Sequence, residues 1–205
     1  MSVCDHQQAM LARLSCIVMR SPVLRPILDR WHDMALPDCW LVAGGLAQSV
    51  WNDSFGMDPL HGIADIDLVY FDPEDLTEQG EAQNANRLGE VFRELPVRLD
   101  VKNEARVHLW YAAKFGAAIS PYCSTLDAIT TFPTTATAVG IRPAGADIAL
   151  VAPFGLDDLM GCVVRPNKKQ ITRDIYEAKF RRWIRYWPDL TIVAWDDVPE
   201  VADIG

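Results

Sequence analysis

The chain has 205 residues, of which 50% are hydrophobic and 23% charged, and its formal net charge is −9. This length and apolar content suffice for one sizeable core, and we expect a single domain over residues 1–205. Within it we expect N-terminal helices (1–38), a central core (39–152), and a C-terminal helical segment with an acidic tail (153–205). The acidic balance argues against broad nucleic-acid binding, which depends on neutralising many phosphates.

The five cysteines form no C-x-x-C pair, so we expect free thiols in a reducing compartment. No Lys or Arg precedes Arg13, which is unlike a secretory signal. No segment approaches the roughly eighteen uninterrupted apolar residues of a membrane-spanning helix. These features predict a cytoplasmic protein without a membrane partner.

Apolar residues at helical spacing predict two opening helices, over about residues 7–19 and 22–34. The apolar run 39–43 then predicts a strand, and residues 46–51 predict an amphipathic helix. A glycine pair separates the two.

Gly44 and Gly45 are that pair. Backbone N–H groups at a glycine turn and at a helix N-terminus can face phosphate, so these residues are candidates for phosphate binding. An ordinary strand-to-helix turn that needs positive φ is the other interpretation.

Asp65 and Asp67 lie on the next predicted strand, residues 63–71. Side chains alternate along a strand, so both carboxylates point to one face while Ile66 points to the other. Their mutual repulsion is relieved when a divalent cation such as Mg²⁺ lies between them. The pair therefore predicts a metal clamp. Alternatively, Asp65 caps a turn and Asp67 is a solvated strand residue.

A helix over about residues 81–95 and a strand over 97–102 follow. On this strand Leu99 and Val101 face one way, and Asp100 faces the other way together with two basic neighbours. The connecting helix places the two carboxylate strands within reach of each other.

The succession of strand, Gly-Gly turn, helix and D-x-D strand resembles the nucleotidyltransferase superfamily that includes DNA polymerase beta, the CCA-adding enzymes and the aminoglycoside nucleotidyltransferases. More narrowly, the chain from about Trp40 to Trp187 looks like a bacterial nucleotidyltransferase-like family whose substrates are not established. The stretches that carry this narrower resemblance are 102–111, 132–137, 153–159 and 165–167. The interval 46–64 between glycines and carboxylates is longer than is usual in the superfamily.

The resemblance implies an α/β (α+β) fold, in which helices flank a mixed β-sheet and the N- and C-terminal segments are helical. It implies that Asp65, Asp67 and Asp100 form a triad for two Mg²⁺ ions. The expected reaction transfers a nucleoside monophosphate from a nucleoside triphosphate (NTP) to the hydroxyl of an unknown small-molecule or protein acceptor, and pyrophosphate is released.

Eight of the nineteen basic residues lie between positions 165 and 185, in and just before a helix predicted over about 171–186. Their charge forms either a wall that holds triphosphate or a solvated basic face. Arg165 and Lys168, which precede the helix, are the preferred phosphate contacts.

Asn103 and Arg106 directly follow the Asp100 strand and are candidates for contact with sugar or phosphate. A helix cap and a surface ion pair are their alternative roles. A helix over about 103–115, strands at 136–141 and 147–151, and a turn at 142–145 complete the predicted elements.

Two other functions fit the D-x-D motif. A glycosyltransferase would use Asp65 and Asp67 to hold the diphosphate of a nucleotide sugar, which leaves Asp100 without a metal role. A non-catalytic nucleotide-binding module would keep the fold without turnover, in keeping with the long interval before Asp65 and the acidic surface.

Overall fold

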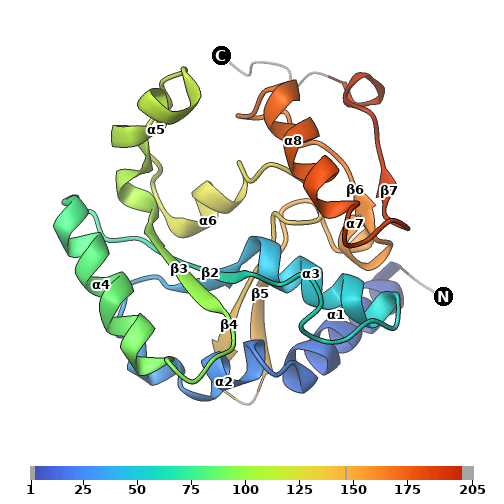
Figure 1. Ribbon diagram of the computed structural model, residues 1–205, viewed down its shortest axis with the longest axis horizontal. Helices are drawn as coiled ribbons and strands as arrows, with labels where there is room; N and C mark the ends of the chain where they lie inside the picture. Colours follow the sequence, from blue (N-terminus) through green and yellow to red (C-terminus); the bar gives the residue numbers. More distant parts are fainter. Residues whose placement is uncertain (1–2, 146, 200–205) are drawn as a thin grey trace.

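A five-stranded mixed sheet with strand order β3-β2-β1-β4-β5 is the centre of the computed structural model, which describes residues 3–145 and 147–199 (Figure 1). β2 and β3 are parallel, β1 is antiparallel to both β2 and β4, and β4 and β5 are antiparallel. The strands are β1 (Trp40–Val42), β2 (Asp65–Tyr70), β3 (Arg98–Asn103), β4 (Gly140–Ala144) and β5 (Asp147–Val151).

Helices flank this sheet, which confirms the predicted fold class. They are α1 (Val3–Arg20), α2 (Leu24–Asp29), α3 (Ala43–Ser54), α4 (Glu78–Val91), α5 (Val107–Phe115), α6 (Thr125–Ile129), α7 (Asp157–Met160) and α8 (Arg173–Trp183). Two short parallel strands, β6 (Val163–Val164) and β7 (Thr191–Ile192), form a second small sheet near α7 and α8. No helix in the described residues is long and apolar enough to cross a membrane.

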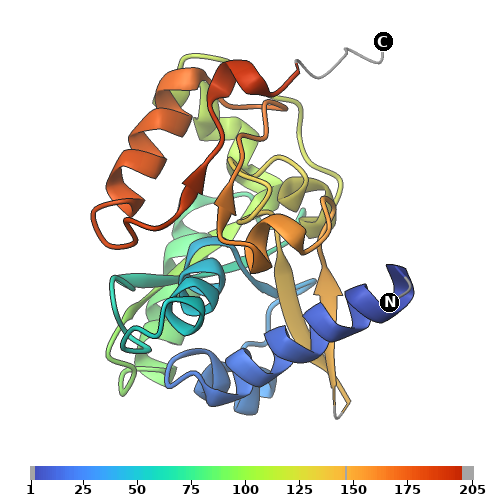
Figure 2. The same cartoon turned by 90° about the vertical axis from the view of Figure 1, so that its right-hand side faces the viewer.

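The two faces of the sheet bury different apolar clusters. Ile66 and Leu68 of β2 point into the larger cluster, which takes side chains from α1, α2, α3 and α4. Val69 points the opposite way and packs with Trp40 against Ile129 of α6. Figures 1 and 2 show α5, α6 and α8 on one side of the sheet and α1 and α2 on the other. Because side chains alternate between the two faces along β2, every second residue of this strand faces the side on which α5, α6 and α8 lie.

Several helices are shorter than the sequence predicts. Instead of one helix over 22–34, α2 ends at Asp29 and a 3-10 helix spans Trp31–Asp33. α5 starts after a 3-10 turn, Glu104–Arg106, because the Asn103 side chain accepts the Ala105 N–H and fixes a tight first turn. The sequence did not predict α6, β6 or β7, which are too short to show a period, whereas a helix was expected to open around residues 155–159, where α7 lies.

The predicted turn over 142–145 is wrong. β4 continues through Arg142 and Pro143, and the chain reverses around Gly145, whose φ is +65°. β4 pairs with β1 only at Gly140 and Ile141, so Pro143 lies beyond the end of β1, where no N–H is required of it.

The glycine pair lies in the first turn of α3 rather than in a turn before the helix, and the positive φ of +57° belongs to Ala43. Gly45 is required by close packing. A Cβ atom there would lie 2.4 Å from Ile66 Cδ1 and 3.1 Å from the Asp65 carbonyl oxygen. The glycines thus let α3 approach the strand that carries the D-x-D motif.

We expect Gly45→Ala to destabilise the protein by about 1 to 3 kcal/mol, although alanine is the better helix former, because the new methyl group overlaps β2. Gly89→Ala in α4 is the matched control, since a Cβ there meets no atom within 4 Å. That variant should gain about 0.5 to 1 kcal/mol. Urea unfolding of both variants measures the difference, and equal effects would contradict the packing argument.

Candidate active site

The three predicted metal-binding carboxylates lie on adjacent parallel strands. Asp67 of β2 pairs in register with Asp100 of β3, and Asp65 lies two residues earlier on β2. Registered neighbours in a sheet point to the same face, so all three side chains share the face on which Val69 packs against Ile129 of α6. The structure therefore brings the predicted triad together.

The N-terminus of α3 contacts the middle carboxylate. The Gly44 N–H donates to Asp67 Oδ2 over 3.1 Å, and a Cβ at Gly44 would lie 3.3 Å from the same oxygen. Gln48, one turn further along α3, has a buried Oε1 without a hydrogen bond in the described structure. Gly44 thus meets the carboxylate directly, at a distance that a larger residue would disturb.

Burial, together with the charges of Asp65 and Asp100, raises the pKa of Asp67 to about 6, although the Gly44 hydrogen bond opposes the rise. Asp65 accepts a hydrogen bond from Arg98 (3.0 Å), and Asp100 lies 3.4 Å from Lys102 Nζ. Basic side chains from β3 therefore neutralise the two outer carboxylates.

These ion pairs affect metal binding. Among residues 3–145 and 147–199, no three His, Cys, Asp or Glu side chains converge closely enough to form a ready metal site. The donor set nevertheless fits a hard divalent cation, because carboxylate oxygens are its preferred ligands and the crowded negative charge favours one. A cation would replace Arg98 and Lys102 as the partner of Asp65 and Asp100.

Lys179 of α8 is a basic residue of this site that the sequence did not single out. Burial lowers its pKa, as do Arg182 and Lys114, whereas the nearby charges of Asp67 and Asp65 raise it. Its Nζ also lies 5.9 Å from the Trp183 ring centroid, one turn along the helix. Its position in the basic helix was visible in the sequence, but nothing there set it apart from its neighbours.

Arg165 and Lys168 make other contacts. Arg165 donates to both carboxylate oxygens of Asp158 in α7, over 2.8 and 3.1 Å. Lys168 Nζ lies 4.9 Å from the Trp195 ring centroid. These contacts connect both residues to the C-terminal part of the fold, and their role in phosphate binding stays a prediction.

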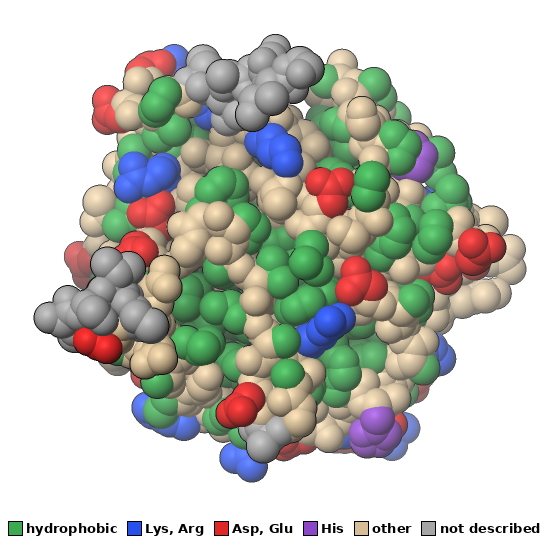
Figure 3. All heavy atoms as spheres, turned by 180° about the vertical axis from the view of Figure 1, so that it is seen from behind, with side chains coloured by type: hydrophobic (Ala, Val, Ile, Leu, Met, Phe, Trp, Pro, Cys, Tyr) green, Lys and Arg blue, Asp and Glu red, His purple; other side chains and the backbone are tan. Residues whose placement is uncertain are grey.

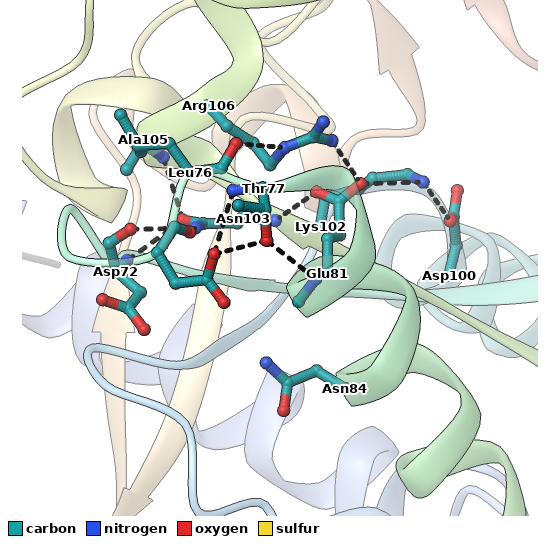
Figure 4. A network of polar contacts seen from close by, with 12 residues as sticks. Asp72, Leu76, Thr77, Glu81, Asn84, Asp100, Lys102, Asn103, Ala105 and Arg106 are labelled. Carbon is teal, nitrogen blue, oxygen red and sulfur yellow. Dashed lines mark hydrogen bonds and ion pairs between the residues drawn. The ribbon is translucent and has the colours of Figure 1, made fainter.

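Asn103 and Arg106 are buried in a polar network beneath the end of β3 (Figure 4). The Asn103 side chain accepts the N–H of Ala105 and donates to the carbonyl oxygens of Asp72 and Asp75. It is therefore the helix cap considered from the sequence, and its amide also secures the loop after β2.

Arg106 forms a buried ion pair with Glu81 of α4 (2.8 Å), in place of the surface pair considered from the sequence. Figure 4 shows the network continuing from Glu81 to Lys102 and on to Asp100. Arg106 is thus connected to the triad through intervening side chains.

Glu104 is a second carboxyl with a displaced pKa. Burial raises its pKa from the ordinary 4.5 to about 8, and the charges of Glu81 and Asp67 add to the rise, while Lys102 opposes it. The folded protein therefore holds a proton on Glu104 between pH 4.5 and 8 that the unfolded chain releases.

Stability should consequently fall as the pH rises through this window, because the folded state binds more protons than the unfolded state. We expect Glu104→Gln, which cannot ionise, to be more stable than the wild type by an amount that grows from about pH 5 and levels off above pH 8. The difference should reach a few kcal/mol, on the order of magnitude that such a pKa displacement implies. Unfolding titrations at stepped pH measure it, and parallel pH profiles for the two proteins would contradict the assignment.

The class of protein follows from these features and from comparison. The family model described as nucleotidyltransferase matches residues 29–192, so the chain belongs to the nucleotidyltransferase family, as its motifs indicated. No curated protein sequence matches the chain.

Two solved structures share its fold. One is an NMR structure described as revealing a CCA-adding enzyme head domain, with 26% identity and a TM-score of 0.72, covering 91% of this chain and 95% of the other. The other is the Thermotoga maritima CCA-adding enzyme in complex with tRNA, with 17% identity and a TM-score of 0.50. That match covers 90% of this chain but only 43% of the Thermotoga enzyme.

Proposed function

We propose that this nucleotidyltransferase transfers a nucleoside monophosphate from an NTP to a hydroxyl acceptor in a Mg²⁺-dependent reaction that releases pyrophosphate. The observation that supports it best is the set of three carboxylates, Asp65, Asp67 and Asp100, on one face of two adjacent parallel strands. The N-terminus of α3 against Asp67 adds to it.

Each carboxylate has a role in this proposal. Asp65 and Asp67 would hold the cation that accompanies the triphosphate, and Asp100 would hold a second cation or accept the proton of the attacking hydroxyl. When bound, such cations neutralise phosphate charge and lower the pKa of the acceptor hydroxyl. Lys179, whose ammonium group is acted on by the charges of Asp67 and Asp65, would add positive charge near the triphosphate.

The acceptor is proposed to be a small molecule or a protein hydroxyl in the cytoplasm. The tRNA bound to the Thermotoga relative makes an RNA end a further candidate. The net charge of −9 disfavours broad phosphate contact, and on the face seen in Figure 3 acidic and basic side chains are interspersed.

The test is to incubate the protein with each α-labelled NTP, Mg²⁺ and a cell extract, and to measure pyrophosphate and labelled product. We expect transfer that disappears in the Asp65→Ala, Asp67→Ala double variant and on chelation of the metal. Binding of NTP without pyrophosphate release would instead support the non-catalytic module. Transfer from UDP- or GDP-sugars alone would support the glycosyltransferase.

A further inference from the structure

A cavity of about 310 Å³ lies between α5, the segment around Phe132 and the start of α8. This volume is at the lower end of the range for small-molecule sites, which are typically apolar with a few polar groups. Its walls are mostly aromatic and aliphatic, and the lining residues that matter here are Glu104, Trp110, Tyr111, Phe132, Gln170 and Lys179.

Glu104 is the unusual member of this lining. Its side chain belongs to a residue that is only 6% exposed, yet its carboxyl makes no hydrogen bond or ion pair to any residue that the structure describes. By contrast, the carboxyl of Glu81, also buried, accepts from the Asn103 N–H and from Arg106. A fully buried polar group is almost always paired, because leaving one unpaired costs about 1 to 3 kcal/mol. The Glu104 oxygens are not among the fully buried unpaired atoms of the described residues, so they open onto the cavity and are available to a polar ligand.

Two residues that line the cavity, Glu104 and Lys179, are within electrostatic reach of the proposed triad. Glu104 follows β3, four positions after Asp100, and the charge of Asp67 acts on it. Lys179 lines the cavity, and the charges of Asp67 and Asp65 act on it. A molecule that enters the cavity thus lies near any triphosphate held at the carboxylates.

We propose that this cavity binds the base of the NTP, with the ring stacked on its aromatic side chains and the polar edge hydrogen-bonded to Glu104. This inference rests on the proposed function. A base has a π-face, which stacks on aromatic side chains, and an edge with a donor beside an acceptor. The protonated Glu104 carboxyl offers a donor and an acceptor side by side, which complements that edge.

Inorganic triphosphate separates base binding from phosphate binding, because it has no base. Dissociation constants for ATP, the other three NTPs and inorganic triphosphate would be measured with Mg²⁺ by titration calorimetry. The variants are Trp110→Ala and Glu104→Leu, with Trp110→Phe and Glu104→Gln as conservative partners that keep a ring or a donor-acceptor pair. Glu94→Leu, which removes an exposed carboxylate, is the matched control.

We expect Trp110→Ala and Glu104→Leu each to weaken binding of the preferred NTP roughly tenfold, as loss of one stacked or hydrogen-bonded contact implies. The conservative partners and Glu94→Leu should stay within about twofold, and triphosphate affinity should not change in any variant. Circular dichroism establishes that each variant is folded, and Glu104→Leu, compared with Glu104→Gln, tests the proposal even where Trp110→Ala does not fold.

Three results would overturn the proposal. The first is that both truncating variants bind NTP as tightly as the wild type does, and the second is that they lose equal affinity for NTP and for triphosphate. The third is that they raise the KM for the acceptor while their affinity for NTP is unchanged. The last result would assign the cavity to the acceptor. Failure of the proposed function can be distinguished from failure of this inference. If the proposed function is wrong, triphosphate binding by the wild type should depend on neither Mg²⁺ nor Asp67.

Discussion

Asp67→Asn should abolish nucleotidyl transfer, by on the order of a thousandfold or more in kcat, without destabilising the fold. The substitution replaces one oxygen and removes one negative charge at the centre of the triad, where the proposed reaction requires an anion to hold the cation that accompanies the triphosphate. The stability expectation follows from the same charges. Asp65, Asp100 and burial all raise the pKa of Asp67, so its ionised form is unfavourable in the folded protein.

Removing that ionised form relieves repulsion, so the melting temperature of Asp67→Asn should equal or exceed that of the wild type at pH 8. Loss of activity together with unchanged or raised stability distinguishes a functional carboxylate from a structural one. Asp29→Asn serves as control, because Asp29 is an exposed carboxylate of α2 paired only at the surface with Arg25. Transfer by Asp67→Asn at the wild-type rate would refute the triad.

The shared face of Asp65 and Asp67 could be predicted from sequence because it depends on local geometry. Side-chain alternation on a strand places Asp65 and Asp67 on one face whatever surrounds them. Asp100 was selected because the resemblance implies a third carboxylate on a later strand, and the structure pairs that strand, β3, in parallel with β2. The mixed sheet follows from the same pattern of short apolar runs and intervening helices.

Residues whose role depends on tertiary packing could not be predicted in this way. Asn103 and Arg106 were selected because they follow the Asp100 strand, yet their partners come from α4 and from the loop after β2. Lys179 and Glu104 show the converse. Each is ordinary in sequence, and only the packing of α8 against the segment around α5 brings both into the lining of one cavity.

The single-domain prediction stays a prediction. It is supported by the larger apolar cluster, whose buried members run from Met10 to Leu190 and so join the N-terminal helices to the C-terminal segment. The part of the predicted acidic tail at 200–205 lies outside the described residues. Four of the cysteines, Cys16, Cys39, Cys123 and Cys162, are free thiols.

The second large effect is expected at the buried ion pair. Arg106→Met should destabilise the protein by about 3 to 5 kcal/mol, because it leaves Glu81 buried without its closest cation. Lys102 cannot take over this role, since its Nζ lies 3.9 Å from Glu81 and is shared with Asp100. Arg181→Met removes an arginine from an exposed pair with Glu177 and should cost less than about 1 kcal/mol.

A double-mutant cycle isolates the pair itself. Glu81→Gln combined with Arg106→Met neutralises both partners and keeps an oxygen for the Asn103 N–H, so the double variant should be more stable than the sum of the single effects predicts. If the changes in unfolding free energy of the two single variants, measured in urea, add up to that of the double variant, the two charges do not interact.

The same double variant should also affect the candidate active site, because Glu81 and Asp100 both interact with Lys102 (Figure 4). In the double variant Lys102 loses Glu81 and is left with Asp100 as its only carboxylate in this network. A cation must then displace a more firmly held lysine, so the Mg²⁺ concentration for half-maximal activity should rise, measured where the variant is fully folded. If the Mg²⁺ requirement is unchanged, the network contributes to stability alone. If the requirement rises, Glu81 also acts as a positioning residue for Asp100.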